Sequence, residues 1–358
     1  MSCLVTGASG LLGSHLVHVL LQDDRFRPIP MIRREEDVVR WKRLGLDPVV
    51  CDLTVKHSLM KLKDIRLDAV VHSAALAGDW ADKERLFALN NKGTEDLLDV
   101  CRQVKRFVHI STIGVYGHKP YHSIDETRPY RKSAPYENSK IEAEKKVLRM
   151  VRENAKTAYV IVRPSTMYGE GDHHFFPRLV KYIRRGKFRF IGWGRINFPV
   201  LHAEDAARFI ASVLTKDVPS GSKYHITGPE ITLREFIATL SKAMGVSPRY
   251  QTLPYYPTLI ASLLFEAYGI LKKKEPYIFR KRIRYLGRSR HLSMANAVTD
   301  FGFKARIPHK DGIVRVLANF LEEEIALSKY GSSDSSSVPF FLEKPFTSVD
   351  RDPIHVHQ

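Results

Sequence analysis

The sequence predicts an α/β fold in which a doubly wound parallel sheet carries a smaller mixed α/β lobe toward the C-terminus. Three observations predict this fold. Short apolar segments alternate with amphipathic helical segments over the first 165 residues, as in a sheet whose crossovers are helices. The apolar segments are rich in Val and Ile on both faces, as expected where helices cover the whole sheet. Beyond Arg163 the alternation loosens and glycines become frequent, which indicates loops that can line a cleft.

The individual elements follow from this alternation. The segments expected as strands are residues 2–6, 28–32, 48–51, 68–72, 106–110 and 158–162. A helical pattern from Leu11 to Leu21 follows the first strand, and another runs from Tyr136 to Met150. A further helix is expected at 233–244, where Thr232 and Glu235 match a capping box.

Composition excludes several classes of protein. The 358 residues include only three cysteines, Cys3, Cys51 and Cys101, none in a CxxC pair. This argues against a disulfide scaffold and a thiolate zinc site, and we expect no metal. No secretory or transit signal is visible, and the apolar run 258–271 contains Glu266 and is shorter than the roughly 20 residues that cross a bilayer. We therefore expect a cytoplasmic protein.

A glycine-rich turn joins the first strand to the first helix. The residues expected to form this loop are Gly7, Ser9, Gly10, Leu11, Leu12 and Gly13. Glycines permit a tight turn and a close backbone approach, and the free N–H groups at a helix start attract a pyrophosphate. The strand–turn–helix context therefore predicts a dinucleotide site and a Rossmann-like sheet.

The domain organisation follows from that site. We expect a dinucleotide-binding domain over residues 1–165 and a substrate-binding lobe, interleaved with it, over 166–330. Residues 331–358 open with a serine-rich run whose composition does not support a packed core, so we expect a disordered tail.

The spacing Gly-x-x-Gly-x-x-Gly resembles the extended branch of the short-chain dehydrogenase/reductase superfamily, the NAD-dependent epimerase/dehydratase group. Further residues fall where that family would place them: Asp52-Leu53, His72-Ser73-Ala74-Ala75, Asn90, Ser111-Thr112, Val115-Tyr116-Gly117 and Arg163-Pro164. The resemblance implies that Asp52, with Leu53 beside it, contacts adenine and that Ala74 and Pro164 flank the cofactor.

The end of the second strand bears on the choice of cofactor. An NAD-specific site usually offers a carboxylate there to the ribose 2′-hydroxyl. This strand ends instead in Arg33 and Arg34, and the first carboxylate is Glu35. A guanidinium pairs well with a 2′-phosphate. We therefore expect NADP, held by Arg33 ahead of Arg34, with NAD as the alternative.

The spacing Tyr-x-x-x-Lys identifies the candidate catalytic pair. It occurs at Tyr136/Lys140, Tyr268/Lys272 and Tyr277/Lys281. Only the first pair begins a helix and follows a Ser-Thr pair at a strand end. Positions i and i+4 share a helix face, so Lys140 can approach both the phenol and the bound ribose. An adjacent ammonium favours the phenolate and makes Tyr136 a general acid/base. Thr112, ahead of Ser111, would bind the substrate oxygen.

The residues after Thr112 narrow the reaction. Family members that dehydrate sugar nucleotides carry an Asp-Glu pair there, whereas this chain has Ile113 and Gly114. Neither side chain can act as the acid and base that elimination needs, so hydride transfer at a hydroxyl or ketone remains. The diphosphate-binding arginine of many epimerases falls at Phe198, which suits an apolar substrate. We expect Asn90 and Phe198 to contact the substrate.

The C-terminal half is similar, in the order and spacing of its motifs, to 3β-hydroxysteroid dehydrogenases and sterol-4-carboxylate 3-dehydrogenases. This resemblance implies a 3β-hydroxysteroid or sterol-like substrate. A nucleotide-sugar epimerase and a dihydroflavonol-type ketone reductase remain alternatives within the family. A cofactor-sensing binding protein without catalysis is the alternative from another class.

The charge distribution suggests the partners. The chain carries a formal net charge of +18, and residues 272–290 hold nine Lys or Arg against one acid, Glu275, directly after the apolar run. Such a segment could rest on an anionic membrane, or the run could cap the substrate pocket beside a solvated basic face. We expect a small, lipid-like substrate and a homodimer. No nucleic-acid module is present, so no nucleic-acid partner is expected.

Overall fold

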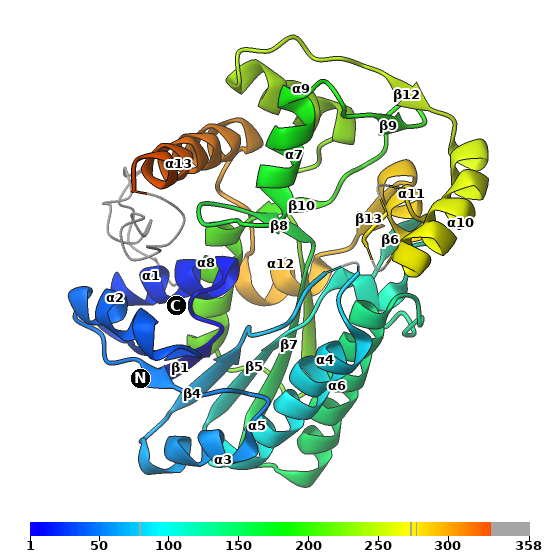
Figure 1. The fold of residues 1–358 in the computed structure, drawn as a ribbon. Helices are drawn as coiled ribbons and strands as arrows, with labels where there is room; N and C mark the ends of the chain where they lie inside the picture. Colours follow the sequence, from blue (N-terminus) through cyan, green and yellow to red (C-terminus); the bar gives the residue numbers. More distant parts are fainter. Residues whose placement is uncertain (79, 273, 277, 331–358) are drawn as a thin grey trace.

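The computed structural model describes residues 1–358 except 79, 273, 277 and 331–358. The expected disordered tail therefore lies outside the described residues. Within them, seven parallel strands form one sheet in the order β11-β7-β5-β4-β1-β2-β3, which confirms the predicted fold class (Figure 1). The strands are β1 (Ser2–Thr6), β2 (Arg27–Ile32), β3 (Val49–Val50), β4 (Ala69–His72), β5 (Arg106–Ile110), β7 (Ala158–Pro164) and β11 (Ser222–Ile226).

Helices cover both faces of this sheet. One face packs against α1 (Leu11–Leu21), α2 (Val38–Arg43), α8 (Ala203–Thr215) and α12 (Ala295–Phe301). The other face packs against α3 (Lys56–Leu59), α5 (Thr94–Val100) and α6 (Pro135–Glu153), with α4 (Lys83–Phe87) beside α6. The strand expected at 158–162 is β7, and the helices expected at 11–21 and 136–150 are α1 and α6. The strand β11 comes from beyond residue 165. The domain boundaries stay a prediction.

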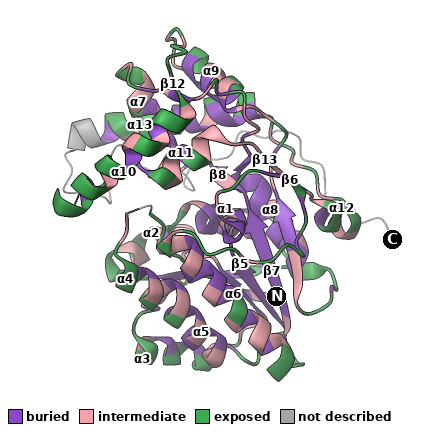
Figure 2. Cartoon of the chain, turned by 90° about the vertical axis from the view of Figure 1, so that its right-hand side faces the viewer, coloured by how far each residue is buried: buried purple, intermediate pink, exposed green. Residues whose placement is uncertain are grey.

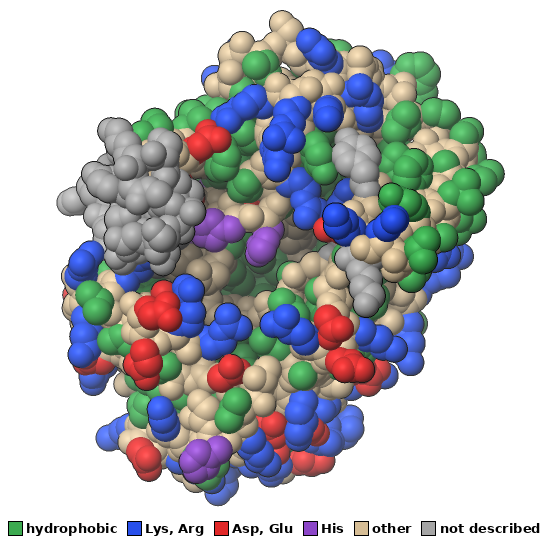
Figure 3. All heavy atoms as spheres, viewed as in Figure 1, with side chains coloured by type: hydrophobic (Ala, Val, Ile, Leu, Met, Phe, Trp, Pro, Cys, Tyr) green, Lys and Arg blue, Asp and Glu red, His purple; other side chains and the backbone are tan. Residues whose placement is uncertain are grey.

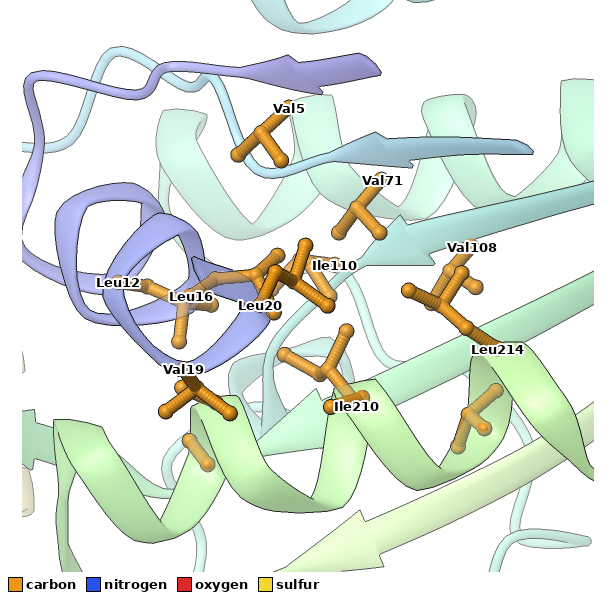
Figure 4. Close-up of a cluster of buried hydrophobic side chains, with 14 of the residues drawn as sticks. Val5, Leu12, Leu16, Val19, Leu20, Val71, Val108, Ile110, Ile210 and Leu214 are labelled. Carbon is orange, nitrogen blue, oxygen red and sulfur yellow. The ribbon is translucent and has the colours of Figure 1, made fainter. Parts of the chain in front are cut away.

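Alternation along each strand divides the core between the two faces. Side chains of successive strand residues point to opposite sides of a sheet. Val5 and Val71 accordingly join the buried cluster of α1 and α8, while their neighbours Leu4 and Val70 join that of α5 and α6. Figure 4 shows the first cluster, in which side chains from α1 and α8 meet the strands. Because both faces are buried, the strands are uniformly apolar.

The second lobe is built from short strands and helices. Its elements are β6 (Tyr121–Ile124), β8 (Thr166–Tyr168), α7 (Phe175–Arg184), β9 (Phe190–Ile191), β10 (Val200–His202), α9 (Leu233–Ala243), β12 (Thr252–Leu253), α10 (Tyr255–Lys272), α11 (Arg280–Gly287), β13 (Arg290–Leu292) and α13 (His309–Tyr330). A separate buried cluster joins α7, α9 and α13. The capping box of Thr232 and Glu235 at the start of α9 is confirmed.

Helix α10 exposes its apolar side chains. Thr258, Ser262 and Gly269 are its buried residues, and most of the helix is exposed in Figure 2. In the part of the chain that the structure describes, no helix is long and apolar enough to cross a membrane. Most side chains of the apolar run are therefore not buried in the lobe.

The α1–α8 interface gives a direct test of the core. Leu16 is completely buried there, whereas Leu21 on the same helix is 41% exposed. We expect Leu16→Ala to lower the free energy of unfolding by about 2–5 kcal/mol, because it leaves a cavity. The control Leu21→Ala should cost less than about 0.5 kcal/mol. Denaturant unfolding measures both, and equal losses would contradict this packing.

Candidate active site and cofactor cradle

The glycine loop lies where the strand order of the sheet reverses, between β1 and β4. Open α/β sheets bind ligands at such a switch point, beyond the carboxyl ends of the strands. Gly7 has a φ of +67°, and a Cβ there would lie 2.7 Å from the Cα of Ala74. A Cβ on Gly13 would lie 2.1 Å from the carbonyl oxygen of Gly7. Both positions therefore require glycine, and Ala74 lies directly against the loop.

The start of α1 fits the diphosphate of a dinucleotide. Its N-cap, Gly10, provides no side-chain hydrogen bond, and no acid lies in the first turn. The first backbone N–H groups of a helix have no partner within it and favour an anion. Ser9 and Gly10 are exposed, Leu11 is half-buried, and Leu12 and Gly13 are buried. The loop and the first turn can thus cradle a dinucleotide, as the sequence predicted.

The ends of β2 and β3 form the adenosine side of this cradle. Arg33 is exposed, and within the described residues no hydrogen bond or ion pair engages its guanidinium. Arg34 is instead paired with Asp37 at 3.2 Å. Burial alone would raise the pKa of Asp52, but hydrogen bonds from Thr54 and the nearby charge of Arg33 hold this pKa below its ordinary value. Arg33 and Asp52 therefore lie close together.

Asn90 connects the cradle to the catalytic helix. Its side chain is buried, accepts a hydrogen bond from the Leu76 N–H at 2.7 Å and donates one to the Leu76 carbonyl at 2.9 Å. The same amide donates to Ser139 Oγ on α6 at 2.9 Å. All of its hydrogen bonds are thus internal. Asn90 holds the loop after β4 against α6, and its contact with substrate stays a prediction.

Tyr136 and Lys140 lie on the first two turns of α6, which Pro135 begins. The Lys140 side chain is buried, and its Nζ donates to the Ile110 carbonyl at the end of β5 at 2.5 Å. Burial lowers the pKa of this ammonium to about 8, although Glu144 opposes the shift. Lys140 is therefore anchored at the carboxyl edge of the sheet, one helical turn beyond the phenol.

The Tyr136 phenol is electrostatically coupled to the second lobe. Burial raises its pKa to about 12, the neighbouring Glu137 carboxylate raises it further, and the Lys281 ammonium opposes both. Lys281 comes from α11, and its Nζ lies 5.8 Å from the centre of the Tyr136 ring. Tyr136 is therefore protonated at neutral pH, and the cation that favours its phenolate here is Lys281.

Glu137 organises the surroundings of that phenol. Its carboxylate is buried and lies 2.7 Å from Lys281 Nζ and 3.4 Å from His118 Nε2. Burial would raise the pKa of Glu137, but His118 and Lys281 hold it below its ordinary value. Sequence reasoning missed all three residues. Glu137 directly follows Tyr136, and Lys281 belongs to a Tyr-x-x-x-Lys pair that was set aside because it begins no helix beside the sheet.

The two hydroxyls after β5 differ in their surroundings. Thr112 is half-buried, and its Oγ1 accepts a hydrogen bond from the Gly114 N–H at 3.1 Å. This leaves its hydroxyl proton available for a substrate oxygen. Ser111 is buried. The geometry therefore favours Thr112 as the ligand for the substrate.

Gly114 admits a carboxylate from elsewhere in the chain. A Cβ at Gly114 would lie 2.8 Å from Cγ of Glu137 and 3.4 Å from Oγ1 of Thr112. Ile113 and Gly114, the two residues after Thr112, supply no acid themselves. The Glu137 side chain instead fills the space beside Gly114.

The remaining residues that we expected at the site are buried. Pro164 is buried at the end of β7, and Leu53 is buried after β3, where its carbonyl packs against Gly93. Phe198 is fully buried in the second lobe, in contact with Phe175, Phe236 and Tyr285. Its contact with substrate stays a prediction.

The described residues show no metal centre in this region or elsewhere. Among them, no three His, Cys, Asp or Glu side chains are grouped so that they could hold an ion.

A sheet edge of this kind defines a class of protein, the oxidoreductases that hold a nicotinamide dinucleotide. The chain belongs to the NAD dependent epimerase/dehydratase family, whose model matches residues 3–227. It is accordingly an NAD(P)-dependent oxidoreductase of the extended short-chain type, which binds a small-molecule substrate.

Individual relatives cover most of the chain at low identity. The 4-hydroxy-2-methyl-3-oxo-4-farnesyl-3,4-dihydroquinoline-1-oxide ketoreductase of Stigmatella aurantiaca is 28% identical over 87% of this chain and 95% of that protein. A 3beta-hydroxysteroid-dehydrogenase/decarboxylase of Arabidopsis thaliana is 26% identical over 89% of this chain and 62% of that protein. UDP-glucuronic acid 4-epimerase from Bacillus cereus, in complex with NAD, has a similar fold, with a TM-score of 0.71, 22% identity, and coverage of 90% of this chain and 99% of that chain.

Proposed function

We propose that this chain is an NADP(H)-dependent oxidoreductase acting on a hydroxyl or ketone of an apolar, lipid-like cyclic substrate such as a 3β-hydroxysteroid or another sterol-like molecule. The observation that carries the proposal is that Lys140, one helical turn beyond Tyr136 on α6, is anchored on the Ile110 carbonyl at the end of β5, two residues before the half-buried Thr112. A homodimer remains an expectation of the sequence.

The chain's own residues divide the reaction between them. The nicotinamide, when bound, supplies or accepts the hydride. The N–H groups of the glycine loop would hold the diphosphate, Asp52 and Arg33 the adenosine end, and Lys140 the ribose. Thr112 donates a hydrogen bond to the substrate oxygen and orients it. In the reducing direction Tyr136 gives its proton to that oxygen, and in the oxidising direction the phenolate takes the proton back.

The raised pKa of Tyr136 keeps the phenol in its proton-donating form at neutral pH. With a pKa of about 12 the phenol remains protonated over the physiological range, so the proton donor for a ketone is always present. At pH values below this pKa, the fraction of Tyr136 in the phenolate form, which oxidation requires, increases tenfold for each unit by which the pH rises. The Lys281 ammonium lowers the pKa of Tyr136 and so limits the rise that burial produces.

An apolar cyclic substrate is supported by the relatives and by the second lobe. The Stigmatella relative is named for a farnesylated cyclic ketone and the Arabidopsis relative for a 3β-hydroxysteroid. In this chain the lobe packs Phe175, Phe198 and Phe236 together. Phe198 stands where many epimerases have their diphosphate-binding arginine, and the absence of that cation supports an apolar ring system over a charged sugar nucleotide.

Helix α10 supports a peripheral contact with an anionic membrane. Ile260, Leu264, Tyr268 and Leu271 are between 61% and 77% exposed, and their spacing places them on one helix face. Figure 3 shows hydrophobic side chains gathered at the side where α10 lies. The exposed Lys272 is the last residue of the helix. Apolar side chains with adjacent cations suit the surface of an anionic bilayer, where a lipid-like substrate is found.

The catalytic assignment is tested with Tyr136→Phe. Removing the phenol proton should lower kcat by about 10²–10⁴-fold, because ring and packing remain while the acid is lost. NADPH binding, followed by its fluorescence, should be unchanged. In the wild type, the rate of alcohol oxidation should rise with pH, because the phenolate fraction of Tyr136 rises. Full turnover by Tyr136→Phe, on steroid or other cyclic ketones, would refute the proposal.

The cofactor assignment is tested with Arg33→Ser and its matched control Arg34→Ser. A charge-assisted hydrogen bond contributes about 1.5–3 kcal/mol, so Arg33→Ser should weaken NADPH binding by about 10–100-fold and leave NADH binding unchanged. Arg34 is paired with Asp37, and its variant should bind NADPH as the wild type does. Equal losses for NADPH and NADH in Arg33→Ser would show that this side chain does not recognise a 2′-phosphate.

The membrane contact is tested by sedimentation with vesicles. Wild-type protein should pellet with vesicles of phosphatidylglycerol and phosphatidylcholine, and less with phosphatidylcholine alone. The double variant Ile260→Glu and Leu264→Glu should reduce binding at least tenfold, since burying each apolar side chain contributes about 1.5–3 kcal/mol. The control Val39→Glu and Val298→Glu changes exposed apolar residues elsewhere. An equal reduction in the control, or no binding by the wild type, would remove α10 as the contact.

A further inference from the structure

A basic pocket lies on the β6–β13 side of the molecule. It has a volume of about 540 Å³, and its charged lining consists of Lys119, Arg131, Lys132, Arg284 and Arg288, with His118 beside them. The first three come from the loops on either side of β6, and the two arginines come from α11 and its end. No carboxylate is part of the lining. The two lobes thus bring five cations together in one concavity.

The acids near this pocket are already paired with other cations. Glu266 pairs with Arg280 at 2.7 Å, and Glu275 pairs with Arg282 at 2.6 Å. Glu137, behind the pocket, pairs with Lys281. Neighbouring carboxylates therefore do not neutralise the lining.

The lining cations themselves have no acidic partner in the described part of the chain. Arg288 donates to the Tyr256 hydroxyl at 3.3 Å and lies 4.2 Å from the centre of the Tyr255 ring. This contact fixes the direction of its guanidinium and leaves its charge in place. The other four form no ion pair within the described residues.

Five like charges around one cavity repel one another, and a bound anion removes this repulsion. A single negative charge would leave most of the lining uncompensated, whereas a ligand with two phosphate groups matches it more closely. One guanidinium group can donate two parallel hydrogen bonds to two oxygens of the same phosphate. The volume suits a small organic molecule.

The pocket is separate from the cofactor cradle and adjacent to the catalytic phenol. The glycine loop begins α1, which lies on the opposite side of the sheet domain from β6 and β13 in Figure 1. His118 lies between the pocket and the Glu137 carboxylate, 3.4 Å away, and Glu137 acts on the pKa of Tyr136. An anion bound here would therefore lie close to the charges that surround Tyr136.

We propose that this basic pocket binds a small organic phosphate with at least two phosphoryl groups, in a second ligand site distinct from the cofactor cradle. This site goes beyond the proposed oxidoreductase activity and does not depend on it. Binding neutralises the cations of both lobes and fastens the 117–120 loop to α11.

Titration calorimetry of the full chain with inorganic pyrophosphate tests the site. NADPH is kept at saturation, so that the cradle is filled and cannot bind the probe. We expect pyrophosphate to bind more tightly than inorganic phosphate, with an affinity that falls as salt is raised. The double variant Arg284→Gln and Arg288→Gln should bind pyrophosphate at least tenfold more weakly.

The matched control is Lys61→Gln with Lys63→Gln, which removes two exposed cations from the far end of the sheet domain. It should bind pyrophosphate as the wild type does, and circular dichroism and NADPH titration should show both double variants folded. No binding by the wild type, or equal weakening in the two variants, would overturn the proposal. Because NADPH binding is measured separately, failure of this site leaves the proposed activity open to its own tests.

Discussion

The buried amide of Asn90 is the constraint on which the geometry of the active site depends. It binds both backbone groups of Leu76 and the hydroxyl of Ser139, so it joins the loop after β4 to the first turns of α6. That loop contains Ala74, against which Gly7 packs without room for a Cβ. The position of the dinucleotide cradle and that of Tyr136 are therefore fixed relative to each other by a few short contacts, which a hydride transfer requires.

The electrostatics of the site depend on both lobes. The sheet domain supplies Tyr136 and Glu137, and burial in it raises the pKa of the phenol. The second lobe supplies Lys281, whose ammonium pairs with Glu137 and opposes that rise. Lys140, on the same helix as the phenol, is instead anchored on the Ile110 carbonyl. The acid strength of Tyr136 thus depends on how closely α11 packs against α6.

Local sequence signals predicted the fold well, because their causes are local. The apolar strands, the glycine loop and the capping box of Thr232 and Glu235 each depend on neighbours within a few residues. The roles of Asn90, Phe198 and Lys281 depend on contacts between distant segments. Spacing in the sequence could not show that Asn90 forms its hydrogen bonds within the protein, that Phe198 is enclosed by other rings, or that Lys281 lies close to Tyr136.

The arrangement of α10 shows why an apolar run was open to two interpretations. Burying Thr258 and Ser262 would normally cost free energy, because a buried hydroxyl needs a partner. Here each hydroxyl donates to a backbone carbonyl of its own chain at 2.6 Å, Thr258 to Pro254 and Ser262 to Leu259. Because these small side chains satisfy their hydrogen bonds locally, they can be buried without another polar partner. The large apolar side chains of α10 are the ones left exposed.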